Sequence, residues 1–284
     1  MANEVAKTPE ASALPAYLAD KQKTAKVGNI DSSDLIIPRL KLLQTVSPEL
    51  ETYNDAKAGN FFHSIAGQML GNELDFIPII VRKSIVLWAP RDDDRRILAR
   101  SSDGVNWDTG FANMEFSVRL KGQPNEIVYK TLGNVAESGL AEFGTAIPND
   151  PKSRPAATLT YNILMYLPKF PDMSPVVAIN ARSSVKPAKN LLSKIEMRPV
   201  DHYFQKYTMG VVKETGAEGP YFNYSYVANG YATEEEAKIT QKLYEKFSSE
   251  SWLANDEADD ASDDAPAAAA KPTTVSEVGQ KGKF

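Results

Sequence analysis

Planar and cationic side chains between Trp88 and Trp107 could hold a single strand of nucleic acid. Base stacking on an aromatic ring contributes about 1–3 kcal/mol per base, and cations neutralise phosphates, so that binding weakens as salt rises. We expect stacking on Trp88 and Trp107 and phosphate contacts from four arginines, namely Arg91, Arg95, Arg96 and Arg100. Alternatively, Trp88 is a core residue and the arginines pair with Asp92–Asp94. The polar neighbours of Trp107 favour an exposed ring.

A second candidate group lies further along the chain and combines tyrosines with lysines: Lys186, Lys189, Lys206, Tyr207, Tyr224 and Tyr226. In a strand, the period of two places Phe222, Tyr224 and Tyr226 on one face. Three aromatic rings on one face form either a stacking platform or half of a hydrophobic core. The helix lysines, including Lys194, could contact phosphate or could form an ordinary solvated face.

Catalytic patterns are weak in this sequence. The two histidines, His63 and His202, are too far apart to suggest metal-ligand spacing, so we interpret each as a local structural residue. The segment Glu126–Lys130 resembles a metal-nuclease strand that carries an acid and a lysine, but no preceding acidic ligand is convincingly placed. The chain also lacks a phosphate-binding Gly-rich lysine loop and a nucleophile elbow. We therefore expect a protein that is not an enzyme, with no catalytic residue, metal or cofactor.

The charge of the chain is divided unevenly. Residues 76–232 hold 19 Lys and Arg against 15 Asp and Glu, a net of +4, together with 18 of the 26 aromatics. Residues 233–265 hold 3 against 11, a net of −8. A basic aromatic body with an acidic tail is typical of proteins that bind single-stranded nucleic acid. The net charge of −5 argues against a general polyanion binder, although a binding face needs only local positive potential.

Many short β-rich segments must position these side chains. Strands are predicted over residues 74–88, 157–167, 175–181, 203–212 and 221–227, and a hairpin pairs 115–121 with 127–130. Helices are predicted from Ser183 or Ser184 to Met197 and from Thr233 to Phe247, the second with Glu236 as a capping-box partner. The segment Leu35–Leu43 contains Pro38, which favours an edge strand or an extended docking segment. This pattern predicts a mainly β fold with a few helices, an elaborated oligonucleotide-binding (OB)-like Greek-key barrel.

The expected organisation has three parts. Residues 1–33 form a flexible N-terminal arm, residues 34–250 the OB-like nucleic-acid-binding domain, and residues 251–284 a disordered acidic C-terminal tail. The absence of Cys excludes disulfides and fits a reducing compartment. No secretory signal and no membrane-spanning stretch are apparent. We expect a protein of the host-cell cytoplasm that does not bind membranes.

Several segments resemble bacteriophage single-stranded-DNA-binding proteins of the OB type. The resemblance spans about Leu35 to Phe247 and is carried by five segments: Phe61–Ile65, Leu74–Ile79, Leu87–Arg91, Ala188–Ile195 and Tyr221–Tyr224. It implies cooperative, sequence-tolerant coating of the strand during phage replication or recombination. In such families an acidic tail that ends in an aromatic residue recruits replication enzymes. Here the acids stop at Asp264, and the chain ends in Lys281-Gly282-Lys283-Phe284.

The sequence therefore predicts a phage protein that coats single-stranded DNA by stacking and phosphate contacts, without sequence specificity. Its expected partners are single-stranded DNA, replication or recombination proteins that bind the tail, and further copies of the chain. A virion or assembly protein is one alternative, in which the aromatics are all core. A recombination nuclease or a strand-annealing protein is another.

Overall fold

The computed structural model describes residues 36–89, 97–119, 126–147, 149–216 and 219–248. The predicted N-terminal arm and acidic tail lie outside these ranges. The fold is mainly β, as predicted. The strands are β1 (Leu40–Leu42), β2 (Phe61–His63), β3 (Gln68–Met69), β4 (Glu73–Trp88), β5 (Ile97–Ser101), β6 (Met114–Val118), β7 (Ile127–Thr131), β8 (Ala157–Tyr166), β9 (Val176–Ala181), β10 (Gln205–Gly216) and β11 (Gly219–Tyr231). The α-helices are α1 (Glu49–Thr52), α2 (Val135–Ser138), α3 (Val185–Glu196) and α4 (Glu234–Ser248); 3₁₀ turns are η3 (Pro171–Met173), η4 (Arg182–Ser184) and η5 (His202–Phe204).

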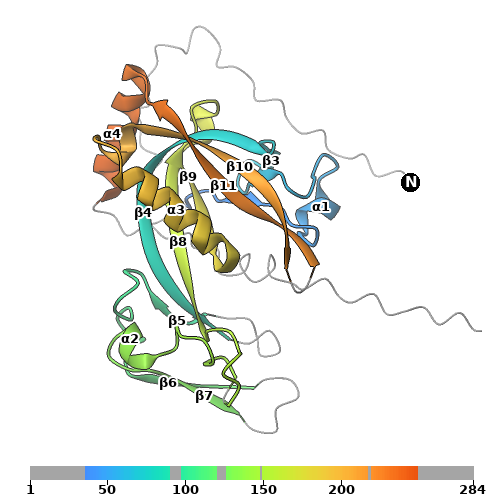
Figure 1. Ribbon diagram of the computed structural model, residues 1–284, viewed down its shortest axis with the longest axis vertical. Coiled ribbons are helices and arrows are strands. Elements are labelled where there is room, and N and C mark those ends of the chain that lie inside the picture. Colours follow the sequence, from blue (N-terminus) through green and yellow to red (C-terminus); the bar gives the residue numbers. More distant parts are fainter. Residues whose placement is uncertain (1–35, 90–96, 120–125, 148, 217–218, 249–284) are drawn as a thin grey trace, which may run out of the picture.

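A six-stranded antiparallel sheet organises the molecule (Figure 1). Its order is β11-β10-β4-β8-β9, and β5 pairs with the far end of β4. Strand β4 has 16 residues and is long enough to pair with β10 near its start and with β5 near its end. A register shift between Pro78 and Ile80 accommodates the proline, which cannot donate a ladder hydrogen bond.

The two faces of this sheet are covered by different elements. On one face, α3 and the small sheet β1-β2-β3 bury rings and aliphatic side chains that include Phe61, Phe76 and Leu191. On the other face, Ile79, Tyr166 and their neighbours pack against Phe247 of α4. Because strand side chains alternate between faces, neighbouring residues of β4 and β8 enter opposite cores.

A second lobe extends from the far ends of β4 and β8 (Figure 1). This distal lobe comprises β5, β6, β7, α2, their connecting loops and the adjoining ends of β4 and β8. Its core includes Leu87, Trp107, Tyr129 and Leu140. The strands β6 and β7 form a separate two-stranded sheet.

Several predicted elements are confirmed. The helix predicted near residues 183–197 is α3, and the one predicted from Thr233 is α4. The capping box is present: the Thr233 amide donates to Glu236 Oε2 at 2.7 Å, and the Glu236 amide donates to Thr233 Oγ1 at 3.3 Å. The predicted hairpin of residues 115–121 with 127–130 forms as β6–β7, and the predicted strands 157–167 and 175–181 pair as β8 and β9.

Two expectations need correction. The strand predicted from Tyr203 begins at Gln205, because residues 202–204 form the turn η5, in which His202 Nε2 lies 2.7 Å from the carbonyl oxygen of Ile79. In addition, the strand pairings of the described residues leave the main sheet open, with β11 and β9 at its two ends, rather than closed into a barrel.

Candidate nucleic-acid interface

The described residues of η4 and α3 and those that follow directly are rich in cations. Residues 182–198 hold five cations (Arg182, Lys186, Lys189, Lys194 and Arg198) and one acid, Glu196. The helix buries Ala188, Leu191 and Ile195 at helical spacing, so that Lys186 and Lys189 are exposed on the opposite side. We call residues 182–198 the α3 basic segment.

The end of the α3 basic segment is fixed to the neighbouring strand. Lys194 Nζ donates to the carbonyl oxygen of Tyr226, and Arg198 donates to that of Gly230 at 2.5 Å. The Arg198 guanidinium also lies over the rings of Tyr207 and Tyr231, 5.1 and 5.0 Å from their centroids. These contacts anchor the helix against β10 and β11, whereas its first half presents Lys186 and Lys189 to solvent.

The three candidate tyrosines Tyr207, Tyr224 and Tyr226 belong to the core. Their exposed fractions are 0%, 9% and 5%. Phe222, Tyr224 and Tyr226 share one face of β11, as predicted, and the rings of Tyr224 and Tyr226 are parallel at 6.0 Å. That face is covered by α3, so these tyrosines cannot stack on a base in this conformation. The stacking-platform interpretation is therefore wrong for this face.

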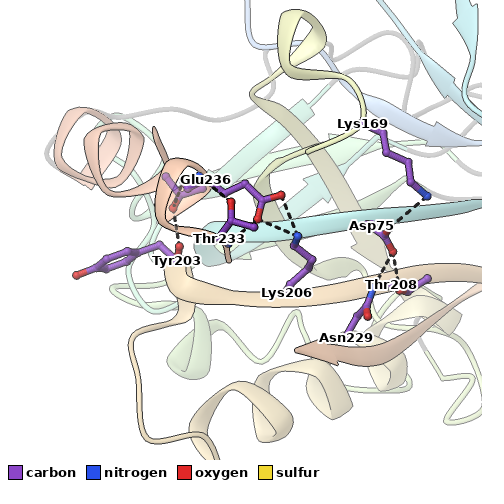
Figure 2. Close-up of polar contacts among 9 residues, drawn as sticks. Asp75, Lys169, Tyr203, Lys206, Thr208, Asn229, Thr233 and Glu236 are labelled. Carbon is purple, nitrogen blue, oxygen red and sulfur yellow. Dashed lines mark hydrogen bonds and ion pairs between the residues drawn. The ribbon is translucent and has the colours of Figure 1, made fainter. Parts of the chain in front are cut away.

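Lys206 forms an ion pair with Glu236 (Figure 2). Its Nζ lies 2.8 Å from both Glu236 oxygens, and both side chains are more than four-fifths buried. Burial acts to raise the pKa of Glu236, but Lys206 and the Thr233 contacts outweigh it, so that the pKa lies below its usual value. The pair joins β10 to the start of α4. In this structure the Lys206 ammonium is thus occupied by Glu236 and holds α4 against β10.

The candidate residues between Trp88 and Trp107 do not share one environment. Arg91, Arg95 and Arg96 lie outside the described residues. Trp88 and Arg100 are half-buried on the paired strands β4 and β5. Trp107 is 5% exposed and fills the core of the distal lobe, so the expectation of an exposed ring is wrong. Its polar neighbours misled the prediction because Asp108 is turned back toward the backbone amide of Ser102, at 2.8 Å.

The two candidate groups occupy different lobes. Lys186 and Lys189 lie on α3 beside the main sheet, whereas Trp88 and Arg100 lie where β4 enters the distal lobe. The structure therefore does not bring the Trp88 group and the lysine group into one compact site.

The residues of the nuclease alternative are held in surface ion pairs. Lys130 Nζ lies 2.6 Å from Glu115, and Glu126 lies 3.4 Å from Arg119, all four with exposed side chains. No group of three or more acidic or histidine side chains among the described residues could hold a metal ion. His63 is buried, and its Nδ1 accepts a hydrogen bond from the Ala66 amide.

A polar cluster that the sequence reasoning missed joins three strands (Figure 2). Asp75 of β4 accepts hydrogen bonds from Thr208 of β10 at 2.7 Å and from Asn229 of β11 at 3.0 Å, and pairs with Lys169 at 3.2 Å. Partial burial acts to raise the pKa of Asp75, but these contacts hold it below its usual value. Strand alternation places the Asp75 side chain on the other face of β4 from those of Leu74 and Phe76. This alternation was the sequence signal that could have identified the cluster. The cluster fixes the register of β4, β10 and β11.

Residues 7–253, most of the chain, match the family described as Pam3 phage gp34-like protein. The chain belongs to that family. It is thus a phage-type protein, which agrees with the coarser part of the resemblance noted above. No curated protein and no solved structure is similar enough to give a match. Among the described residues, none of the helices has the length and the apolar character that crossing a bilayer requires.

Proposed function

We propose that this phage protein binds single-stranded DNA without cleaving it, and that the α3 basic segment supplies the main phosphate contacts. The observation that carries the proposal is the charge of that segment: five cations and one acid, a net of +4 over 17 residues, on an element whose first half is exposed. Lys186 and Lys189 lie one helical turn apart, so that both ammonium groups can reach one strand.

Binding by this surface would depend more on phosphate than on base contacts. The candidate tyrosines are buried. Among the aromatic candidates that the structure describes, this leaves the half-buried Trp88 for base stacking. Contacts to phosphate carry no sequence information, so the proposed binding is independent of sequence. Under this proposal the acidic tail competes weakly for the basic surface or recruits replication or recombination proteins.

The experiment is an anisotropy titration of a labelled oligo-dT strand at several salt concentrations. The test variant carries Lys186→Ala and Lys189→Ala. The matched control carries Lys238→Ala and Lys242→Ala, the same charge change on α4, which packs on the opposite face of the main sheet. Each lost phosphate contact lowers the slope of log affinity against log salt by about 0.7 for a single strand, so two contacts lower it by about 1.4.

The proposal requires the α3 variant to show this smaller slope and the α4 control to match the wild type. Equal losses in the two variants would indicate a general charge effect and would refute a site on α3. Absence of salt-sensitive binding in the wild type would remove the DNA-binding function altogether.

A virion or assembly role is the second candidate, and one observation favours it. The distal lobe exposes several large apolar side chains: Val105, Met114, Val128, Leu132 and, at 78% exposure, Phe143. Exposed apolar side chains that form a contiguous patch are typical of protein-binding surfaces, and this role would require these five to act together. Stable protein complexes without salt-sensitive DNA affinity would favour this role.

A further inference from the structure

The two terminal strands of the main sheet, β11 and β9, have backbone groups on their outer edges that are already bonded. On β11, Gln44 bonds the backbone of Phe222 twice, accepting from its amide at 2.9 Å and donating to its carbonyl at 3.0 Å. Lys194 and Arg198 cover the carbonyls of Tyr226 and Gly230 further along. At the other edge, the β9 amide of Val177 donates to the Pro38 carbonyl at 2.8 Å. These bonded backbone groups are not available to a strand of another molecule.

The β6–β7 hairpin differs from the main sheet in this respect. It forms a sheet of two strands, and no other strand among the described residues pairs with β7 on its outer side. Alternate residues of such a strand direct backbone N–H and C=O groups outward, which is the arrangement that a further strand would bind. The hairpin lies at the opposite end of the long axis from α4 (Figure 1).

We propose that the outer edge of β7 pairs antiparallel with β7 of a second copy of this chain, about a two-fold axis at Val128. The result is a four-stranded sheet in the order β6-β7-β7-β6 that spans the dimer. This inference is independent of the proposed DNA binding.

The charges on the hairpin favour this pairing. Within one chain, Glu115 lies opposite Lys130 and pairs with it, and Arg119 pairs with Glu126. A two-fold axis at Val128 places Glu126 of one copy opposite Lys130 of the other, because each is two residues from the axis. The row across the dimer then reads Glu115, Lys130, Glu126, Arg119. Charges alternate in sign throughout, and directly opposed unlike charges stabilise a sheet.

The residue at the proposed axis is apolar. Val128 is 46% exposed on the free hairpin and would lie directly against Val128 of the second copy. Its cross-strand neighbour within the chain is Ser117, which is small and uncharged. Burial of Val128 is therefore favourable in the pair, whereas an ammonium group at this position would face a second one across the axis.

The test measures dimer formation by sedimentation velocity over a range of protein concentrations. The variants are Val128→Lys and Val128→Glu, and the matched control is Ser117→Lys, on the neighbouring strand away from the axis. Each Val128 variant opposes like charges in its own dimer, so its dissociation constant should rise by about tenfold or more. The control should dimerise like the wild type.

Mixing provides the decisive measurement. A mixture of equal amounts of Val128→Lys and Val128→Glu should restore the dimer, because the axis then joins a cation to an anion; this recovery also shows that both variants are folded. Restoration, with a normal control, supports the proposed axis. A wild type that stays at the monomer mass of 31.2 kDa at every concentration, a mixture that does not recover, or a control as impaired as the Val128 variants would overturn it.

Discussion

The hydroxyl of Tyr226 provides a direct test of whether the β11 aromatics are core residues. It donates to Asn180 Oδ1 at 2.7 Å, and both side chains are buried. Burial raises the pKa of Tyr226 well above its ordinary value, so the hydroxyl stays protonated and able to donate. We expect Tyr226→Phe to destabilise the protein, since the ring and its packing remain while the Asn180 acceptor is left buried without this donor.

The expected magnitude follows from the geometry. A buried group left without its partner costs about 1–3 kcal/mol. In a domain of this size each kcal/mol lowers the melting temperature by about 2–4 °C, so the melting temperature should fall by about 2–12 °C. The Asn180 Nδ2 donor keeps its contact with the Tyr161 carbonyl at 3.5 Å, but this contact does not replace the donor that Asn180 Oδ1 loses.

The assay is urea and thermal unfolding of the wild type, Tyr226→Phe and a control, Tyr231→Phe. Tyr231 is 53% exposed, and its contact with Arg198 is made by the ring, which phenylalanine retains. The control should stay within about 0.5 kcal/mol of the wild type, as surface substitutions usually do. If Tyr226→Phe is as stable as the control, the buried hydrogen bond does not contribute as argued.

Three further predictions concern stability. Glu49→Ala should cost about 3–5 kcal/mol in urea unfolding, because it removes a carboxylate that lies 2.9 Å from Lys41 Nζ in a buried ion pair. An unchanged unfolding midpoint would refute this. Burial lowers the pKa of His63 below 6.5, so the unfolded state binds a proton at a higher pH than the folded state does. The stability of the fold should therefore fall as the pH drops below about 6.5. In thermal melts across that pH window His63→Gln should reduce this fall, and an identical pH profile would contradict the argument. Thr233→Ala should cost about 1 kcal/mol by removing the cap of α4, measured by thermal unfolding, and an effect no larger than that of an exposed surface substitution would argue against it.

Local patterns predicted the elements well. The Thr233 and Glu236 capping box located the start of α4, and the alternation around Glu115 and Lys130 located the β6–β7 hairpin. These features depend on neighbours in sequence, which a single sequence contains. The period of two also grouped Tyr224 and Tyr226 correctly on one face.

The candidate site was harder to predict, because exposure depends on what covers a face. Nothing near Tyr226 in sequence indicates that α3, some thirty residues earlier, packs over it. Trp107 shows the same limit: its neighbours are polar, yet its own ring completes the distal core. The pairing of Lys206 with Glu236 likewise joins residues 30 positions apart. Charge along one helix, as in Lys186 and Lys189, is local, and their exposure could be predicted.

The chain leaves the main sheet for the distal lobe and returns to the main sheet at adjacent positions. Leu87 of β4 lies opposite Ala157 of β8, so the intervening chain begins and ends within one strand pair. Apart from β5, every strand of the main sheet lies outside this intervening chain, so the distal lobe is inserted as a long elaboration of the β4–β8 hairpin. Relatives could therefore exchange or shorten this insertion without altering the order β11-β10-β4-β8-β9. The two lobes can then diverge at different rates, and the module that carries the exposed β7 edge can be lost or replaced as a whole.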